Sequence, residues 1–153
     1  MSVPSPAARL EAAFRAIATG RMAGLPLCNP GLGVEAVDFR RTPTGHWAGA
    51  LITPWGINLL CLPDGEAPWP RAGADGKCQW RFPSGDYEFT RASEDSLGEF
   101  HLCSLFSPAL EFGSHDEARQ VAQAAVTALF EAPAAREEPA RAPGRRRFLG
   151  LGA

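Results

Sequence analysis

The sequence has no run of apolar residues that approaches the roughly 18 needed for a transmembrane helix. The first twenty residues, MSVPSPAARLEAAFRAIATG, carry charged and polar side chains where an export signal needs a continuous apolar stretch. The formal net charge of -2 over 153 residues gives no electrostatic basis for binding nucleic acid or an acidic membrane surface. We therefore expect a cytoplasmic protein that neither binds nucleic acid nor inserts in a membrane.

Paired cysteines and familiar catalytic motifs are also missing. The four cysteines, Cys28, Cys61, Cys78 and Cys103, are far apart and form no CxxC pair. This spacing argues against a disulfide framework or a zinc ribbon, so we expect free thiols in a reducing compartment. The sequence also lacks a P-loop, a dinucleotide fingerprint, an HExxH motif and a nucleophile elbow. It favours binding over catalysis, and we expect no enzyme activity and no cofactor.

The hydrophobic pattern locates two helices and a set of strands. A helix is predicted to start near residue 6 and to end at residues 20–24, because Leu10, Phe14 and Ile17 recur at spacings of four and three. A second helix is predicted from a cap at Ser114 to about Phe130. Between them, alternating or short apolar runs predict strands at 34–40, 46–53, 57–62, 78–82, 86–92 and 99–106.

This order of elements predicts an α+β fold, in which an antiparallel sheet of five to six strands is flanked by an N-terminal and a C-terminal helix. We expect both helices to cover one face of the sheet, and Val37 and Phe39 to point together toward the core. Residues 1–132 are expected to form this single domain. Residues 133–153 are rich in proline, alanine and charge, so we expect a disordered basic tail.

Few individual residues have the chemistry for a site. Cys103 and His101 lie two apart on a predicted strand and share a face, but a cysteine in an apolar strand is usually a small buried hydrophobe. Cys28 lies in a loop, where functional residues are more frequent. Trp55, in a turn, is either a lid over the core or an exposed anchor for a partner. Trp69 is expected in a mobile loop without a defined role.

Four stretches follow one another in the sequence: LPLCNPGLGVEAV (25–37), LITPWGINLLCLP (51–63), FPSGDYEF (82–89) and CSLFSPALEF (103–112). Together, over about residues 10–130, they resemble the HybE/HupJ family of nickel–iron hydrogenase assembly chaperones. The resemblance implies an accessory protein without enzyme activity that assists assembly of a membrane-bound uptake hydrogenase. Such a protein would hold the precursor of a hydrogenase structural subunit, alongside other maturation proteins, before twin-arginine export.

Two departures from the family pattern stand out. The residue after Thr-Pro-Trp, bulky and apolar in the family, is Gly56 here, which would reshape an apolar patch at this turn. The rubredoxin-like segment with CxxC pairs that some relatives carry is missing, so no iron of that kind is implied. The positions that match the pattern are Asn29, Pro30, Glu35, Thr53, Pro54, Trp55, Asn58, Phe82, Pro83, Gly85, Phe89, Cys103, Ser104, Phe106, Ser107 and Pro108.

The resemblance leads to two hypotheses about binding. In the first, an uncovered face or edge of the sheet carries a groove that binds a twin-arginine signal peptide. Apolar contacts would supply affinity for its apolar run, and acids at the rim would select its arginines. In the second, Cys28 and Cys103 hold a precursor of the hydrogenase metal centre, because thiolates are soft metal ligands. The candidate groove residues are Trp55, Ile57, Asn58, Phe106 and Pro108, with Glu35 and Glu111 at the rim.

The last nine residues, RRRFLGLGA, resemble the core of a twin-arginine export signal at Arg145, Arg146, Phe148 and Leu149. An export signal has a longer apolar run and lies at the N-terminus, so we do not expect this segment to act as one. Two interpretations remain open. The segment is either a solvated basic tail or a copy of the motif. Such a copy would occupy the domain's own groove or engage whatever component reads such motifs next.

Overall fold

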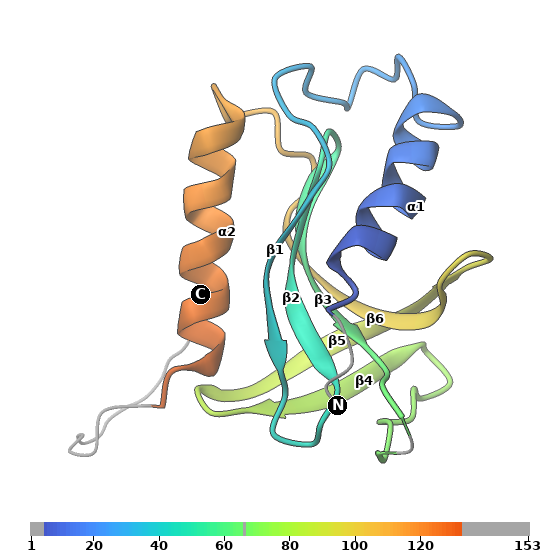
Figure 1. Ribbon diagram of the computed structural model, residues 1–153, viewed down its shortest axis with the longest axis vertical. Helices are drawn as coiled ribbons and strands as arrows, with labels where there is room; N and C mark the ends of the chain where they lie inside the picture. Colours follow the sequence, from blue (N-terminus) through green and yellow to red (C-terminus); the bar gives the residue numbers. More distant parts are fainter. Residues whose placement is uncertain (1–4, 66, 133–153) are drawn as a thin grey trace.

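The computed structural model describes residues 5–65 and 67–132 (Figure 1), and the predicted tail at 133–153 lies outside this part of the chain. It confirms the predicted α+β class, with six strands between two helices. No helix among the described residues is long and apolar enough to cross a membrane. The elements are α1 (Ala7–Thr19), β1 (Glu35–Arg41), β2 (Trp47–Thr53), β3 (Gly56–Leu62), β4 (Lys77–Phe82), β5 (Gly85–Glu94), β6 (Gly98–Phe106) and α2 (His115–Phe130).

The six strands form one sheet in the order β1-β2-β3-β6-β5-β4, with antiparallel pairing between all neighbours. β2 and β3 lie inside the sheet, and nearly every residue of both strands is buried. A strand buried on one face alternates between apolar and polar residues, whereas a strand covered on both faces is apolar throughout. The runs WAGALIT and GINLLCL therefore require cover on both faces of the sheet.

The two helices supply that cover from opposite sides (Figure 1), so the prediction that both share one face is wrong. Successive residues of a strand point to opposite faces. In β2, Ile52 packs in the cluster beneath α2, while Leu51 packs with Leu10 of α1. The α2 face and the α1 face of the sheet thus have separate cores. α2 buries Ala118, Ala122, Val126 and Leu129, whereas Leu10 is the buried residue of α1.

β1 contains a bulge that corrects a second prediction. Its pairing with β2 shifts between Val37 and Arg40, and Asp38 within the bulge has φ +56°. The extra residue rotates the strand, because a bulge reverses the alternation of side chains beyond it. Val37 consequently packs in the α2-side core and Phe39 against the α1-side core, rather than both on one face. Gly49 admits the Phe39 ring, since a Cβ there would lie 2.5 Å from it.

Trp69 has a defined position, contrary to the prediction of a mobile loop. Its indole Nε1 donates a hydrogen bond of 3.0 Å to Glu99, and its ring centroid lies 4.3 Å from that of His101. His101 in turn accepts a 2.9 Å hydrogen bond at Nδ1 from the Trp80 indole. Burial lowers the pKa of His101, so the neutral ring is favoured, and the Trp69 hydrogen bond lowers the pKa of Glu99. This cluster fastens the β3–β4 loop onto the α2 face of the sheet.

Candidate functional site

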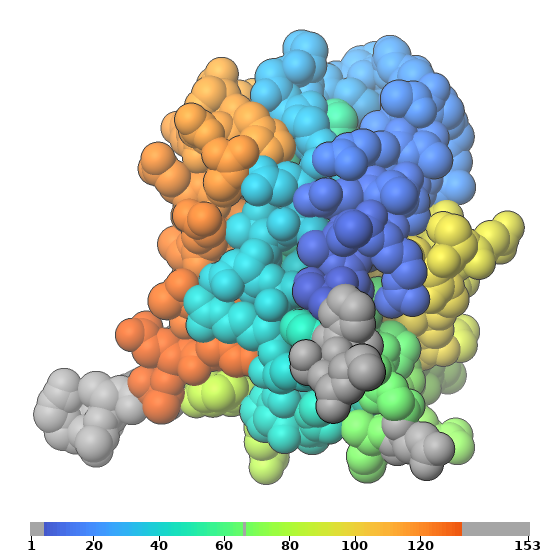
Figure 2. Space-filling model, viewed as in Figure 1, coloured from blue at the N-terminus to red at the C-terminus, as the bar shows by residue number. Residues whose placement is uncertain are grey.

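Asn29 ties three separate segments together at one end of the molecule. Its backbone N–H donates to the Pro54 carbonyl at 2.6 Å, and its side-chain amide donates to the carbonyls of Ala109 (3.0 Å) and Phe112 (2.9 Å). Its Oδ1 accepts a hydrogen bond from Gly31. We call this region the apical end, formed by residues 20–34, 53–56 and 107–114. The light-blue and orange loops at the top of Figures 1 and 2 belong to it.

The apical end carries the exposed apolar surface of the described chain. Among the described residues, the large hydrophobic side chains that are exposed are Leu25 (38%), Leu27 (40%) and Leu110 (53%). All three lie on the two apical loops that Asn29 connects. Apolar side chains that gather at one place on a surface indicate a site for a partner. Pro108 and Glu111, both predicted site residues, are exposed on the same loop as Leu110.

A cavity of about 210 Å³, here called the α1–sheet cavity, opens below the apical end on the α1 face. It exists because α1 packs mainly against β1 and leaves the apolar side chains of β3, β6 and β5 partly uncovered. Trp55 and Asn58, two of the predicted site residues, lie in its wall. The full lining is Phe14, Ile17, Arg21, Met22, Leu51, Trp55, Asn58, Leu60, Ala92, Glu94, Phe100 and Leu102.

Two charged groups, Arg21 and Glu94, lie in the mainly apolar wall of this cavity. Arg21 Nη2 lies 2.6 Å from Glu94 Oε2, and this pair joins the segment after α1 to the end of β5. The Arg21 side chain is 64% exposed and that of Glu94 is 23% exposed. An ion pair with so much solvent around the cation contributes only about 0–1 kcal/mol. Glu94 is therefore a partly sheltered carboxylate whose present partner can be exchanged at little cost.

A second hollow of about 370 Å³ lies beside the first, and Met22 lines both. It is formed by the segment that follows α1 and by the β2–β3 turn, with Leu25, Leu32 and Pro54 in its wall. Cys28 also lines it, and the Cys28 thiol donates to the Met22 carbonyl at 3.3 Å. The two hollows adjoin at Met22, and the exposed Leu25 lines the second of them.

The structure does not gather all the predicted groove residues in this region. Ile57 is completely buried in the α2-side core. Phe106 packs on the same side, edge-on against Phe112 at a centroid distance of 5.0 Å. Trp55 and Asn58 therefore lie on one side of the sheet, and Ile57 and Phe106 on the other. The role of each residue in binding a partner stays a prediction, but they do not line a single groove.

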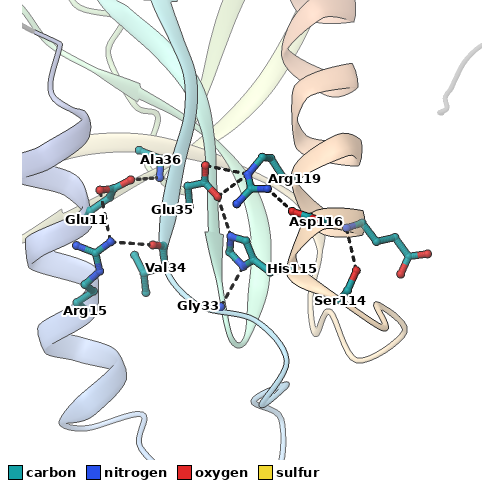
Figure 3. Close-up of polar contacts among 11 residues, drawn as sticks. Glu11, Arg15, Gly33, Val34, Glu35, Ala36, Ser114, His115, Asp116 and Arg119 are labelled. Carbon is teal, nitrogen blue, oxygen red and sulfur yellow. Dashed lines mark hydrogen bonds and ion pairs between the residues drawn. The ribbon is translucent and has the colours of Figure 1, made fainter.

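Glu35 joins β1 to the first turn of α2 (Figure 3). Its carboxylate accepts from His115 Nε2 at 2.7 Å and from Arg119 Nε at 2.9 and 3.1 Å. His115 Nδ1 accepts from the Gly33 backbone N–H at 3.1 Å, which leaves the ring proton on Nε2. Arg119 also pairs with Asp116. These contacts make Glu35 a tie within the fold on the α2 side rather than an acid at the rim of the α1–sheet cavity.

The two cysteines proposed as metal ligands lie in different surroundings. Cys103 packs against the α2-side core, where burial and the nearby Glu88 carboxylate raise its thiol pKa, while Cys28 lines the second hollow. A raised pKa disfavours the thiolate that binds metal. Within residues 5–65 and 67–132, no three His, Cys, Asp or Glu side chains are arranged to hold a metal ion.

Sequence reasoning missed Arg21 and Glu94, because no local pattern signals a pair that joins residues 73 positions apart. The tail residues Arg145, Arg146, Phe148 and Leu149 lie outside the described part of the chain.

Comparison with known proteins supports the assignment suggested by the motifs. Residues 5–151 match the family described as NiFe-hydrogenase assembly, chaperone, HybE. The chain is 40% identical over 146 residues to the hydrogenase expression/formation protein HupJ of Bradyrhizobium diazoefficiens, covering 92% of this chain and 84% of the relative. It is 39% identical over 150 residues to Protein HoxT of Cupriavidus necator, covering 90% of this chain and 83% of that relative.

The fold agrees with this result. The solution structure of HybE from Escherichia coli matches with a TM-score of 0.64 and 29% sequence identity, covering 93% of this chain and 91% of that one. Three of the four sequence stretches that carry the resemblance, at 25–37, 51–63 and 103–112, meet at the apical end through the Asn29 hydrogen bonds. The chain belongs to the HybE family of nickel–iron hydrogenase assembly chaperones.

Proposed function

We propose that this protein is a cytoplasmic, non-catalytic chaperone that holds the precursor of a hydrogenase structural subunit, together with other maturation proteins, before twin-arginine export. Its target segment is the twin-arginine signal peptide of the precursor. The observation that carries the proposal is the α1–sheet cavity, which combines an apolar interior and the indole of Trp55 with the Glu94 carboxylate. The family membership supplies the hydrogenase as the client.

The chemistry of the cavity fits such a peptide. A twin-arginine signal has arginines followed by an apolar run. An apolar side chain of the peptide would fill the cavity, while one of its arginines would replace Arg21 on Glu94 in a charge-assisted hydrogen bond. Leu25, which lines the adjoining second hollow, and the exposed Leu27 of the same loop would extend the apolar contact, as anchors surrounded by weaker contacts do in other interfaces.

The size of the cavity limits what enters it. A cavity of about 150 Å³ lined by apolar side chains is large enough for a benzene molecule. The α1–sheet cavity, at about 210 Å³, therefore accommodates one large side chain rather than a whole helix. The rest of the signal peptide would lie across the apical surface.

A cavity-filling substitution tests this proposal. Ala92 lines the cavity from β5, and Ala92→Phe would place a ring inside it. Thr90→Phe is the matched control, because Thr90 is exposed and points to the same face two residues away on β5. We expect Ala92→Phe to weaken binding of a synthetic twin-arginine signal peptide at least tenfold in calorimetry and Thr90→Phe to leave it within about twofold, as neighbouring contacts usually do.

A second experiment compares the intact precursor with a precursor that lacks its signal peptide. We expect affinity capture of the intact small-subunit precursor from producing cells and much weaker capture of the shortened form. Equal capture of both forms would refute signal-peptide recognition. Equal weakening by Ala92→Phe and Thr90→Phe would refute the cavity as the site.

A further inference from the structure

The tail segment and the α1–sheet cavity have complementary chemistry. Residues 145–149 read Arg-Arg-Arg-Phe-Leu, so cations precede two large apolar side chains. The cavity offers an apolar interior with one carboxylate, Glu94, in its wall. The match to the chaperone family runs to residue 151 and so includes this segment.

We propose that residues 145–149 dock in the α1–sheet cavity of the same molecule, with the Phe148 ring inside the cavity and a tail arginine on Glu94. The docking itself does not depend on the proposed function. Its consequence does: if the cavity receives signal peptides, the tail competes with them for the same site.

The cavity volume fits the ring of Phe148. An apolar cavity of about 150 Å³ holds benzene, and a phenylalanine ring is a benzene ring with one substituent. About 210 Å³ leaves room for that ring and its methylene group. The second hollow, which shares Met22 with the first, provides an adjoining apolar surface for Leu149.

The positive charge of the tail is also complementary to Glu94 when Phe148 points into the cavity. Between residues 136 and 147 the chain has five arginines and two glutamates, a net charge of +3. Glu94 pairs with Arg21, whose side chain is 64% exposed, so one guanidinium would exchange for another with little cost. A tail arginine on Glu94 would place the apolar residues that follow it next to the cavity.

The connecting chain is long enough. Sixteen residues lead from Ala132, the last described residue, to Phe148, and sixteen residues span at most about 55 Å. A domain of this size has a radius of gyration of about 14 Å, so its full width is within reach even though α2 lies on the other face. Intramolecular linkage at this length gives an effective concentration near the millimolar range, so even a weak contact would be populated.

Nuclear magnetic resonance of two chains tests the docking directly. The full chain is compared with a chain that ends at Ala142 and keeps every described residue. We expect the two spectra to differ at the Trp55 indole and at the amides of Ala92 and Leu102, which line the cavity. Ser84 and Leu129, which contact each other at the end of α2, are the reference positions and should not differ. Identical spectra, or differences confined to the reference positions, would overturn the docking.

Point variants identify the docked group. Phe148→Ala in the full chain should reproduce the spectrum of the shortened chain at the cavity, whereas Leu151→Ala, in the same tail, should leave it unchanged. Differences that grow with protein concentration would show that the tail of a second copy is bound, which would overturn the intramolecular form. If both variants leave the cavity resonances in the full-chain positions, Phe148 is not the anchor and the inference fails.

The affinity of a synthetic twin-arginine peptide for the two chains separates this inference from the proposed function. If the tail occupies the cavity half to nine-tenths of the time, the shortened chain should bind the peptide about two- to tenfold more tightly. A peptide that binds neither chain would refute the proposed function while the spectra still decide the docking. Equal binding to both chains, with identical spectra, would refute the tail inference and leave the proposed function standing.

Discussion

Asn29→Asp is the sharpest test of how the apical end is held together. The change keeps the shape of the side chain and replaces its amide donor with an acceptor. Asn29 is 8% exposed, and its Nδ2 donates to the carbonyls of Ala109 and Phe112. An ionised aspartate would direct a carboxylate oxygen at the two carbonyl oxygens. The hydrogen bond from Gly31 to Oδ1 would remain.

The expected cost follows from those contacts. Each lost hydrogen bond contributes about 0.5–1.5 kcal/mol, and a buried carbonyl left without a donor costs about 1–3 kcal/mol more. We expect the free energy of unfolding of Asn29→Asp to fall by roughly 2–4 kcal/mol at pH 7, on the basis of the two bonds that Nδ2 makes.

The pH dependence provides a second signature. The protonated carboxyl can donate one hydrogen bond, so the folded variant binds its proton more tightly than the unfolded chain, whose aspartate has a pKa near 3.9. Its pKa is therefore raised on folding. The variant should recover stability relative to the wild type as the pH falls through this raised pKa toward about 4.

Urea denaturation at pH 7 and at pH 5, followed by circular dichroism, measures both effects. Gln123→Glu is the control, since it makes the same amide-to-carboxylate change at an exposed position on α2. We expect the control to change the unfolding free energy by less than about 1 kcal/mol. A loss below about 1 kcal/mol for Asn29→Asp at pH 7, or a loss that does not shrink on acidification, would refute this account of the apical end.

Three further predictions concern other parts of the fold. Gly56→Ala should lower the free energy of unfolding, measured by urea denaturation, by about 1–3 kcal/mol, because a Cβ there would lie 2.8 Å from the Phe106 carbonyl oxygen. Gly33→Ala is the control, because Gly33 has open space around it, and it should change the free energy of unfolding by less than about 1 kcal/mol. The His101 ring should titrate below about pH 6.5 in an NMR titration, because burial lowers its pKa. The unfolded chain, whose histidine has the higher pKa, therefore binds a proton first as the pH falls. The free energy of unfolding should decrease as the pH falls below about 6.5. Leu110→Ser should change stability by less than about 0.5 kcal/mol, since Leu110 is 53% exposed, but should reduce precursor capture in a pull-down.

The sequence was sufficient to predict the elements but not their arrangement around the sheet. Strong apolar periodicity located both helices and all six strands within a few residues. The faces were predicted wrongly because an amphipathic helix does not reveal which side of a sheet it covers. A signal was nevertheless present, since WAGALIT and GINLLCL are apolar at nearly every position and so require cover on both faces.

Other features depend on contacts that no local pattern contains. Phe39 faces the α1 side only because Asp38 adopts a positive φ within a bulge. Trp69 is held by Glu99, thirty residues away, although its own loop is rich in proline and glycine. The charged pair of the α1–sheet cavity likewise depends on a long-range contact. Sequence reasoning therefore identified Trp55 and Asn58 of this cavity but missed its carboxylate.

The two helices bury different amounts of side chain against the sheet, and the α1–sheet cavity lies beside the helix that buries less. α2 buries four side chains at helical spacing, and Ser114 caps its N-terminus by accepting from the Glu117 N–H. α1 buries only Leu10 completely. The Ser5 hydroxyl accepts from the Ala7 N–H at its start, and the Glu11 carboxylate accepts from the Ala36 N–H of β1. Val126 and Leu129 are the large buried side chains of α2, against Leu10 in α1. Burial of one such side chain contributes about 1.5–3 kcal/mol, so apolar burial anchors α2 more strongly than α1. If a signal peptide or the tail binds in this cavity as proposed, we expect α1 to shift at lower cost than α2.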